Sequence, residues 1–208
     1  MSRPSTTARD EILTETRRRL LEAAAEEFAR KGFTAANINH ISTAAGYAKG
    51  TIYNYFSSKR SLMLALIDEI ADFHTNFIVS RVVSEPDPIQ RLTRFFSAGY
   101  EFFDQHPAIS QVAISIIYGH DKELKERMFQ TYEGLFNLII KDIVETGVTR
   151  GHFRPVDPNK TAALLMSLYL GSCSLLDPDG KVWFKPDQVV AFVLAGLQQS
   201  CDHDANEA

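Results

Sequence analysis

Cysteine is scarce in this sequence, which has only Cys173 and Cys201 among its 208 residues. Each of the two lies in an apolar stretch, and they show none of the regular spacings of a secreted disulfide framework. The pattern argues against a scaffold held by disulfides, and we expect two buried free thiols.

Long apolar runs are also absent from the sequence. The first residues carry no apolar stretch of the kind that forms a signal peptide. No run approaches the roughly 18 apolar residues that cross a bilayer. Both absences favour a cytoplasmic protein that has no membrane partner.

Residue patterns for catalysis or metal binding are incomplete. Lys49-Gly50-Thr51 has lysine before glycine, whereas a phosphate loop has glycine before lysine, and no predicted strand precedes it. Ser172-Cys173-Ser174 lacks the flanking glycines of a nucleophile elbow. The six histidines form no i, i+4 pair and have no cysteine partner for zinc, although folding can still bring His106 and His120 together. We therefore expect no enzyme, no cofactor and no metal site.

Negative charge is missing from one part of the chain. The net charge is −4, but residues 1–60 carry ten Lys and Arg against six Asp and Glu, while residues 61–208 carry twelve against twenty. No carboxylate occurs from Phe28 to Ile67, a span that holds five basic residues. A surface without carboxylates can approach phosphates. Charge alone does not separate DNA binding from chance depletion in a short segment, so the motifs decide.

Apolar residues recur at helical spacing and no stretch alternates with a period of two, so the sequence predicts an all-α fold. The first helix spans Thr14 to Arg30, and Gly32 supplies the left-handed residue that follows it. Asn37 is the expected N-cap of a second helix, and Gly46 the turn after it. Ser57-Ser58 caps a long helix whose apolar stripe reaches Phe77. The other helices are expected at 48–56, 89–105, 107–118, 122–150, 159–176 and 187–200.

Two short helices joined by a glycine turn are typical of proteins that place a helix in the major groove of DNA. In the helix 48–56, Ile52 and Phe56 face the core, so Gly50 and Asn54 face outward. Glycine lets the backbone approach DNA closely, and the asparagine amide suits adenine. The flanking residues of this expected reading surface are Lys49, Thr51, Tyr53 and Tyr55.

The segment from Gly32 to Leu62 resembles the TetR family of repressors. The resemblance covers about the first 65 residues by motif and the remaining helices by count and length. The matching residues occur in order at the family's spacings: Gly32-Phe33, Ile38, Ile41, Ala44-Ala45-Gly46, Lys49-Gly50-Thr51-Ile52-Tyr53, Phe56, Lys59 and Leu62.

The resemblance implies a DNA-binding site and a domain plan. A three-helix domain with a helix-turn-helix at 14–60 is joined by a long fourth helix to a larger effector-binding and dimerisation domain at 61–201, with 1–13 and 202–208 flexible. Asn37 and Asn39 are expected to touch DNA, and Lys59 to hold a phosphate. Ala48 stands where the family often has the serine or threonine cap, and Tyr47 where a small aliphatic residue is usual. The predicted DNA-binding set is Asn37, Asn39, Ala48, Lys49, Gly50, Thr51, Tyr53, Asn54, Tyr55 and Lys59.

The predicted DNA-binding and ligand-binding residues can also have purely structural roles. Tyr53 can serve packing with its hydroxyl at the surface, and the lysines can be solvated surface charges. The aromatic residues of the C-terminal part are by default core, but relatives enclose an apolar effector pocket there. The predicted ligand-binding set is Phe96, Tyr100, Phe103, Tyr118, Phe129, Tyr132, Phe136 and Tyr169.

The last two expected helices are apolar on more than one face, and a second apolar face is buried most economically by a partner subunit. The residues concerned are Ala162, Ala163, Leu165, Ser167, Leu168, Gly171, Ser172, Val189, Val190, Val193, Ala195, Gly196 and Leu197.

The sequence therefore predicts a homodimeric, sequence-specific DNA-binding transcriptional regulator. We expect a repressor that a small, largely apolar effector releases from a near-palindromic operator of double-stranded DNA. The alternative is a helical protein-interaction module, or a ligand-binding protein, without specific DNA binding. Weak, sequence-blind DNA binding would indicate that alternative.

Overall fold

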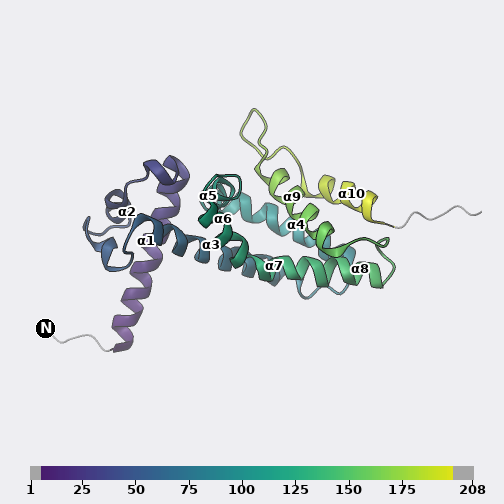
Figure 1. Cartoon of the computed structure of the whole chain (residues 1–208), viewed down its shortest axis with the longest axis horizontal. Helices are drawn as coiled ribbons and strands as arrows, with labels where there is room; N and C mark the ends of the chain where they lie inside the picture. Colours follow the sequence, from purple (N-terminus) through teal and green to yellow (C-terminus); the bar gives the residue numbers. More distant parts are fainter. Residues whose placement is uncertain (1–5, 199–208) are drawn as a thin grey trace, which may run out of the picture. The chain divides into compact units, whose positions relative to one another are not determined.

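The computed structural model describes residues 6–198, with side chains from Asp10 onward (Figure 1). The expectations for Cys201 and for segments 1–5 and 202–208 lie outside these residues. The described chain forms two compact units. Residues up to 73 together with 106–131 make the first unit, and residues 74–105 with those from 132 onward make the second.

The first unit consists of α1 (Thr6–Ala35), α2 (Ile38–Ala44), η1 (Thr51–Asn54), the start of α3 (Lys59–Val82), α5 (Pro107–Ile117) and α6 (Lys122–Thr131). Helix α1 packs against α2 and α5, and α2 packs against η1. Apolar residues at helical spacing form the inward faces of α1, α2 and the η1 segment. Ile38 is half-buried. The others are buried, namely Leu20, Leu21, Ala24, Ala25, Phe28, Ile41, Ala45, Ile52 and Phe56.

The caps and the glycine turns expected for the first helices are confirmed. Gly32 has a φ of 71° and kinks α1, which extends to Ala35 rather than stopping at Arg30, and Gly46 has a φ of 86° after α2; glycine adopts both angles without a Cβ clash. The Asn37 side chain accepts hydrogen bonds from the N–H groups of Asn39 and His40, at 2.9 and 3.3 Å. Ser58 Oγ accepts from the Ser61 N–H at 3.0 Å and so caps α3. Helix α1 begins at Thr6 rather than Thr14, because no glycine or proline interrupts the chain between them.

The helix expected at 48–56 is wrong in type. Residues Thr51–Asn54 form a 3-10 helix, and the bonds from Thr51 N–H to Ala48 O and from Tyr53 N–H to Gly50 O span three residues. Two features of the sequence explain the tighter turn. Ala48 has no side chain that can cap the segment, and Gly50 and the β-branched Thr51 both disfavour an α-helix.

The second unit consists of the end of α3, from His74 to Val82, and of α4 (Pro88–Gln105), α7 (Glu133–Leu138), the π-helical η2 (Ile139–Glu145), α8 (Thr146–Thr149), α9 (Pro158–Ser174) and α10 (Pro186–Leu197). Helix α4 packs against α9, α10 and η2. The helices expected at 89–105, 107–118, 159–176 and 187–200 agree with the structure within a few residues. Cys173 is a buried free thiol, as expected.

The single helix expected at 122–150 is wrong. It is interrupted at Tyr132, whose φ and ψ of −87° and 4° leave the helical region, and its later part is π-helical. The Tyr132 hydroxyl hydrogen-bonds to His74 Nδ1 at 3.0 Å, and Gly134 weakens the helix just after the break. The regular spacing of apolar residues in the sequence does not predict such a break in the helix.

No strand forms within residues 6–198, so the all-α class is confirmed for the part of the chain that is described. Two isolated bridges occur, Phe153 with Gln198 and Leu176 with Val182. Among the described helices none is long and apolar enough to span a membrane.

Candidate nucleic-acid interface

The segment around η1 presents its polar side chains outward. Ile52 is fully buried and Phe56 nearly so, while Tyr53 is 51% exposed and Asn54 is exposed. This is the inward and outward division predicted from the sequence, although the segment is a 3-10 helix. Asn54 is therefore free to meet a base edge.

The residues before η1 leave room for a close backbone approach. Ala48, Lys49 and Gly50 are all exposed. A Cβ built on Gly50 would meet no atom within 4 Å, so nothing in the first unit crowds this position. Thr51 and Tyr55 are half-buried.

Asn37 has a structural task in addition to its predicted DNA contact. Its side-chain oxygen is used to cap α2, so the amide NH₂ is the group that remains to donate to DNA. Asn39 is exposed beside it. Donors of this kind suit phosphate oxygens.

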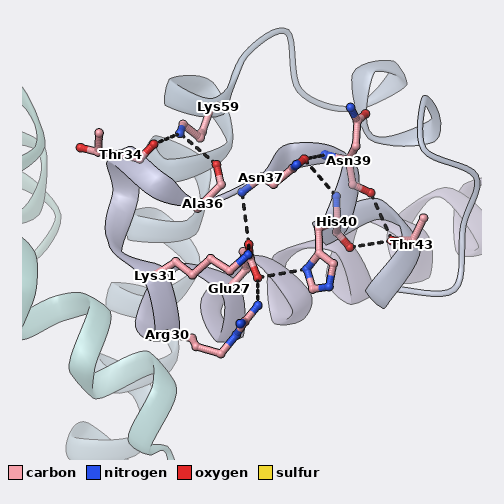
Figure 2. A network of polar contacts seen from close by, with 10 residues as sticks. All are labelled: Glu27, Arg30, Lys31, Thr34, Ala36, Asn37, Asn39, His40, Thr43 and Lys59. Atoms are coloured by element: carbon pink, nitrogen blue, oxygen red, sulfur yellow. Dashed lines mark hydrogen bonds and ion pairs between the residues drawn. The ribbon is translucent and has the colours of Figure 1, made fainter.

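Lys59 is held inside the first unit rather than projecting as a solvated charge. Its Nζ donates to the carbonyl oxygens of Thr34 and Ala36, at 2.8 and 3.0 Å (Figure 2). The same Nζ lies 5.2 Å from the centre of the Phe33 ring. An ammonium group has three donors, so one is left for a phosphate. The sequence did not predict this brace, because its partners are backbone carbonyls.

A shallow groove brings three of the predicted DNA contacts together. Asn37, Tyr53 and Lys59 line it, and its volume is about 400 Å³. An amide, a phenol and an ammonium all donate hydrogen bonds, so the groove has the chemistry of a phosphate site.

Glu27 lies at the centre of the polar network in Figure 2, although its charge predicts a place on the polar side of the first helix. It is only 3% exposed. Its Oε1 accepts the backbone N–H of Asn37 at 3.2 Å and lies 3.0 Å from Lys31 Nζ. Its Oε2 lies 3.0 Å from His40 Nδ1 and pairs with Arg30.

The surroundings of Glu27 keep it ionised. Burial alone would raise the pKa of the carboxyl, but hydrogen bonds from Lys31, the Asn37 N–H and Arg30 outweigh burial and lower the pKa to about 2. A signal for this role was present in the sequence. Glu27 follows Leu20 and Ala24 at i+7 and i+3 and so falls on the apolar face of the helix.

The predicted ligand-binding residues divide between the two units. Phe96 and Tyr169 are fully buried in the core of the second unit, and Tyr100, Phe103, Tyr132 and Phe136 pack around that core. Tyr118 and Phe129 belong to the first unit and are 59% and 64% exposed, so they do not line this core. Tyr118 follows the end of α5, and Phe129 lies on the face of α6 opposite Leu124.

His74 joins two of these tyrosines in the interior. Its Nδ1 lies 3.0 Å from the Tyr132 hydroxyl, and its Nε2 lies 2.9 Å from the Tyr169 hydroxyl. A neutral imidazole donates with one nitrogen and accepts with the other, so it satisfies both hydroxyls. Burial lowers the pKa of His74 to about 4. Within the described part of the chain, no group of three acidic, histidine or cysteine residues is placed to hold a metal ion.

Comparison with known proteins assigns a family to the N-terminal motif. The model described as "Bacterial regulatory proteins, tetR family" matches residues 20–66, which include α2, η1 and the start of α3. The helix-turn-helix transcriptional repressor KstR2 of Mycobacterium tuberculosis is 27% identical over 152 residues, or 65% of this chain and 68% of that protein.

Two further similarities extend beyond the motif. YvdT, an uncharacterized helix-turn-helix transcriptional regulator of Bacillus subtilis, is 30% identical over 135 residues, or 64% of this chain and 70% of that protein. The structure of the transcriptional regulator FadR from Bacillus subtilis in complex with stearoyl-CoA has a TM-score of 0.71 at 19% identity, and the alignment covers 86% of this chain and 95% of that one.

Proposed function

This chain belongs to the TetR family of bacterial regulatory proteins, and from that premise we propose that it represses transcription from a near-palindromic operator until a small, largely apolar effector binds. The observation that carries the proposal is that Lys49, Gly50 and Asn54 are exposed next to Tyr53, which lines the groove together with Asn37 and Lys59. No carboxylate occurs between Phe28 and Ile67 to repel DNA.

Each polar residue of this surface has a proposed task. Asn54 reads adenine through its amide, and Lys49 donates to guanine or to phosphate. Gly50 allows the protein backbone to come close to the edge of the DNA major groove. Asn37, Tyr53 and Lys59 hold phosphates, and these contacts fix the register without reading sequence. Ala48, Thr51, Tyr55 and Asn39 complete the proposed interface.

The last two helices supply a proposed dimer surface. On α9, Leu165 faces the core while Leu164 is 65% exposed, and on α10, Val193 is buried while Phe192 is 72% exposed. Both helices therefore carry apolar side chains on an open face, which a second copy would cover. A two-fold dimer would hold two reading segments at a fixed separation and so select a near-palindrome.

The division of tasks between the parts of the chain is also a proposal. We assign DNA binding to 14–60 and effector binding and dimerisation to 61–201. By packing, residues 61–73 and 106–131 belong with the DNA-binding segment in the first unit. A repressor acts where the chromosome is, which in a bacterium is the cytoplasm, and we assign the chain no catalytic role.

Operator selection tests the DNA-binding proposal. Purified protein is incubated with a library of random duplexes, and the retained duplexes are sequenced. We expect enrichment of a near-palindrome whose half-sites lie about 10 base pairs apart, or a multiple of that distance. Retention without an enriched sequence would contradict the proposal and favour the helical interaction module.

The effector is proposed to bind in the second unit, whose core combines aromatic side chains with the polar group of His74, Tyr132 and Tyr169. The FadR structure contains stearoyl-CoA, and we propose an acyl chain as the apolar part of the effector here. Stearoyl-CoA is titrated into the protein bound to its selected duplex, with coenzyme A alone as the control. We expect about a tenfold loss of operator affinity with the thioester only, within the usual range of coupling. Equal operator affinity in the two titrations would exclude stearoyl-CoA as the effector.

A further inference from the structure

Glu27 contacts α2 at two points although it belongs to α1. Its carboxylate accepts the backbone N–H of Asn37, the N-cap residue, and pairs with the ring of His40 in the first turn. We propose that Glu27 is a positioning residue for DNA recognition, which sets the orientation of α2 and hence of Asn37 and Asn39. The inference rests on the proposed function and adds a residue that does not itself touch DNA.

Together with two other hydrogen bonds, the contact with Glu27 holds both the backbone and the side chain of Asn37 in place. The backbone N–H of Asn37 is bonded to Glu27, and its side-chain oxygen is bonded to the N–H groups of Asn39 and His40. Three separate bonds therefore fix the residue in its backbone and in its side chain. A side chain that is fixed before binding loses little conformational entropy when it contacts DNA.

Lys59 holds the same turn from the other side. Its ammonium group bonds the carbonyls of Thr34 and Ala36, while Glu27 bonds the N–H of the next residue, Asn37 (Figure 2). The turn from α1 to α2 thus lies between an acid on α1 and a base on α3. If the Glu27 carboxylate is removed, the hydrogen bonds of Lys59 still hold the turn in its conformation, but α2 loses its bonds to the carboxylate.

The charges around Glu27 give the proposal a distinctive signature. Glu27 neutralises basic groups at Arg30 and Lys31. Without the carboxylate these groups attract any duplex more strongly, because non-specific binding depends on the charge of the protein. Loss of Glu27 should therefore weaken operator binding while binding to unrelated DNA stays equal or increases. A protein that is merely less stable would lose both.

The test compares Glu27→Ala with Glu26→Ala at one salt concentration, on the selected operator and on a scrambled duplex. Glu26 is exposed on the same helix, so its variant has the same charge change without the contacts to α2. For Glu27→Ala we expect the ratio of operator affinity to scrambled affinity to fall about tenfold or more, because the phosphate contacts of α2 set the register in which Asn54 meets its base, and a disrupted base contact costs about that much. For Glu26→Ala the ratio should stay within about twofold, because charge acts on both duplexes.

Glu27→Gln and His40→Ala keep the test decisive if Glu27→Ala does not fold. Glutamine retains an acceptor for the Asn37 N–H but loses the ion pairs, so it should restore part of the ratio. His40→Ala removes the second contact and should lower the ratio. Ratios equal to that of Glu26→Ala would overturn the inference. If wild-type protein shows no preference for any duplex, the proposed function fails instead.

Discussion

Replacing Tyr169 by alanine should lower the free energy of unfolding by about 3–5 kcal/mol, the usual cost of removing a buried aromatic side chain. Tyr169 is fully buried, with ring centres 5.2 Å from Phe95 and 5.8 Å from Phe103. It also packs on Gly99, where a Cβ would lie only 2.0 Å from the tyrosine ring. The alanine variant leaves a cavity and removes the hydroxyl partner of His74.

Urea unfolding followed by circular dichroism measures this loss. Tyr118→Ala is the matched control, because the same side chain is 59% exposed there and its removal should change stability by no more than about 0.5 kcal/mol. Gly99→Ala should be destabilising in the wild-type protein and tolerated in the Tyr169→Ala background, since the clashing ring is then absent. Equal losses for Tyr169→Ala and Tyr118→Ala would show that Tyr169 does not hold the second unit together.

Stability should fall by about 3 kcal/mol as the pH drops from 6.5 to 4, because of His74. Burial lowers the pKa of His74 from 6.5 to about 4 in the folded chain. Between these values the unfolded chain binds the proton and the folded chain does not, so acid favours unfolding. The contribution is fully present above pH 6.5 and is lost on the way down to pH 4.

His74→Gln supplies the control for this pH dependence, since glutamine can still donate and accept hydrogen bonds but does not titrate in this range. The free energy of unfolding is measured by urea titration at several pH values. We expect the variant to lose most of the slope between pH 4 and 6.5. Identical slopes between pH 4 and 6.5 in the wild-type and His74→Gln proteins would contradict the role of His74.

Glu27 affects stability at lower pH. Its pKa of about 2 lies below the ordinary 4.5, so the stability that it contributes is lost as the pH falls from 4.5 towards 2.

The elements that sequence predicted correctly depend on local chemistry. Asn37 and Ser58 cap helices because their side chains bond N–H groups two or three residues ahead. Gly32 kinks α1 and Gly46 follows the end of α2, because the positive φ angles at these positions suit glycine. The inward positions of Ile52 and Phe56 follow from spacing alone, and they hold even though the segment is a 3-10 helix.

The features that sequence did not predict depend on partners brought together by folding. Glu27 and Lys59 bond backbone groups of Asn37, Thr34 and Ala36. The helical spacing marks Glu27 as a residue on the apolar face, but no side-chain pattern marks the backbone groups that it and Lys59 bond. The break at Tyr132 involves a hydrogen bond to His74, which is distant in the sequence. The predicted DNA and effector contacts themselves stay predictions until they are measured with DNA and ligand.

Repeating the operator selection with Asn54→Ala is the most direct test of the claim that the exposed η1 segment reads DNA. The variant should still enrich a near-palindrome, because the phosphate-binding residues and the dimer are intact, but it should lose base preference at one symmetric pair of positions. Its salt dependence should match that of the wild type, whereas Lys59→Ala should reduce the slope of log affinity against log salt by about 1 for each phosphate that the protein no longer neutralises. An Asn54→Ala profile identical to that of the wild type at every position would contradict the proposed role of this segment.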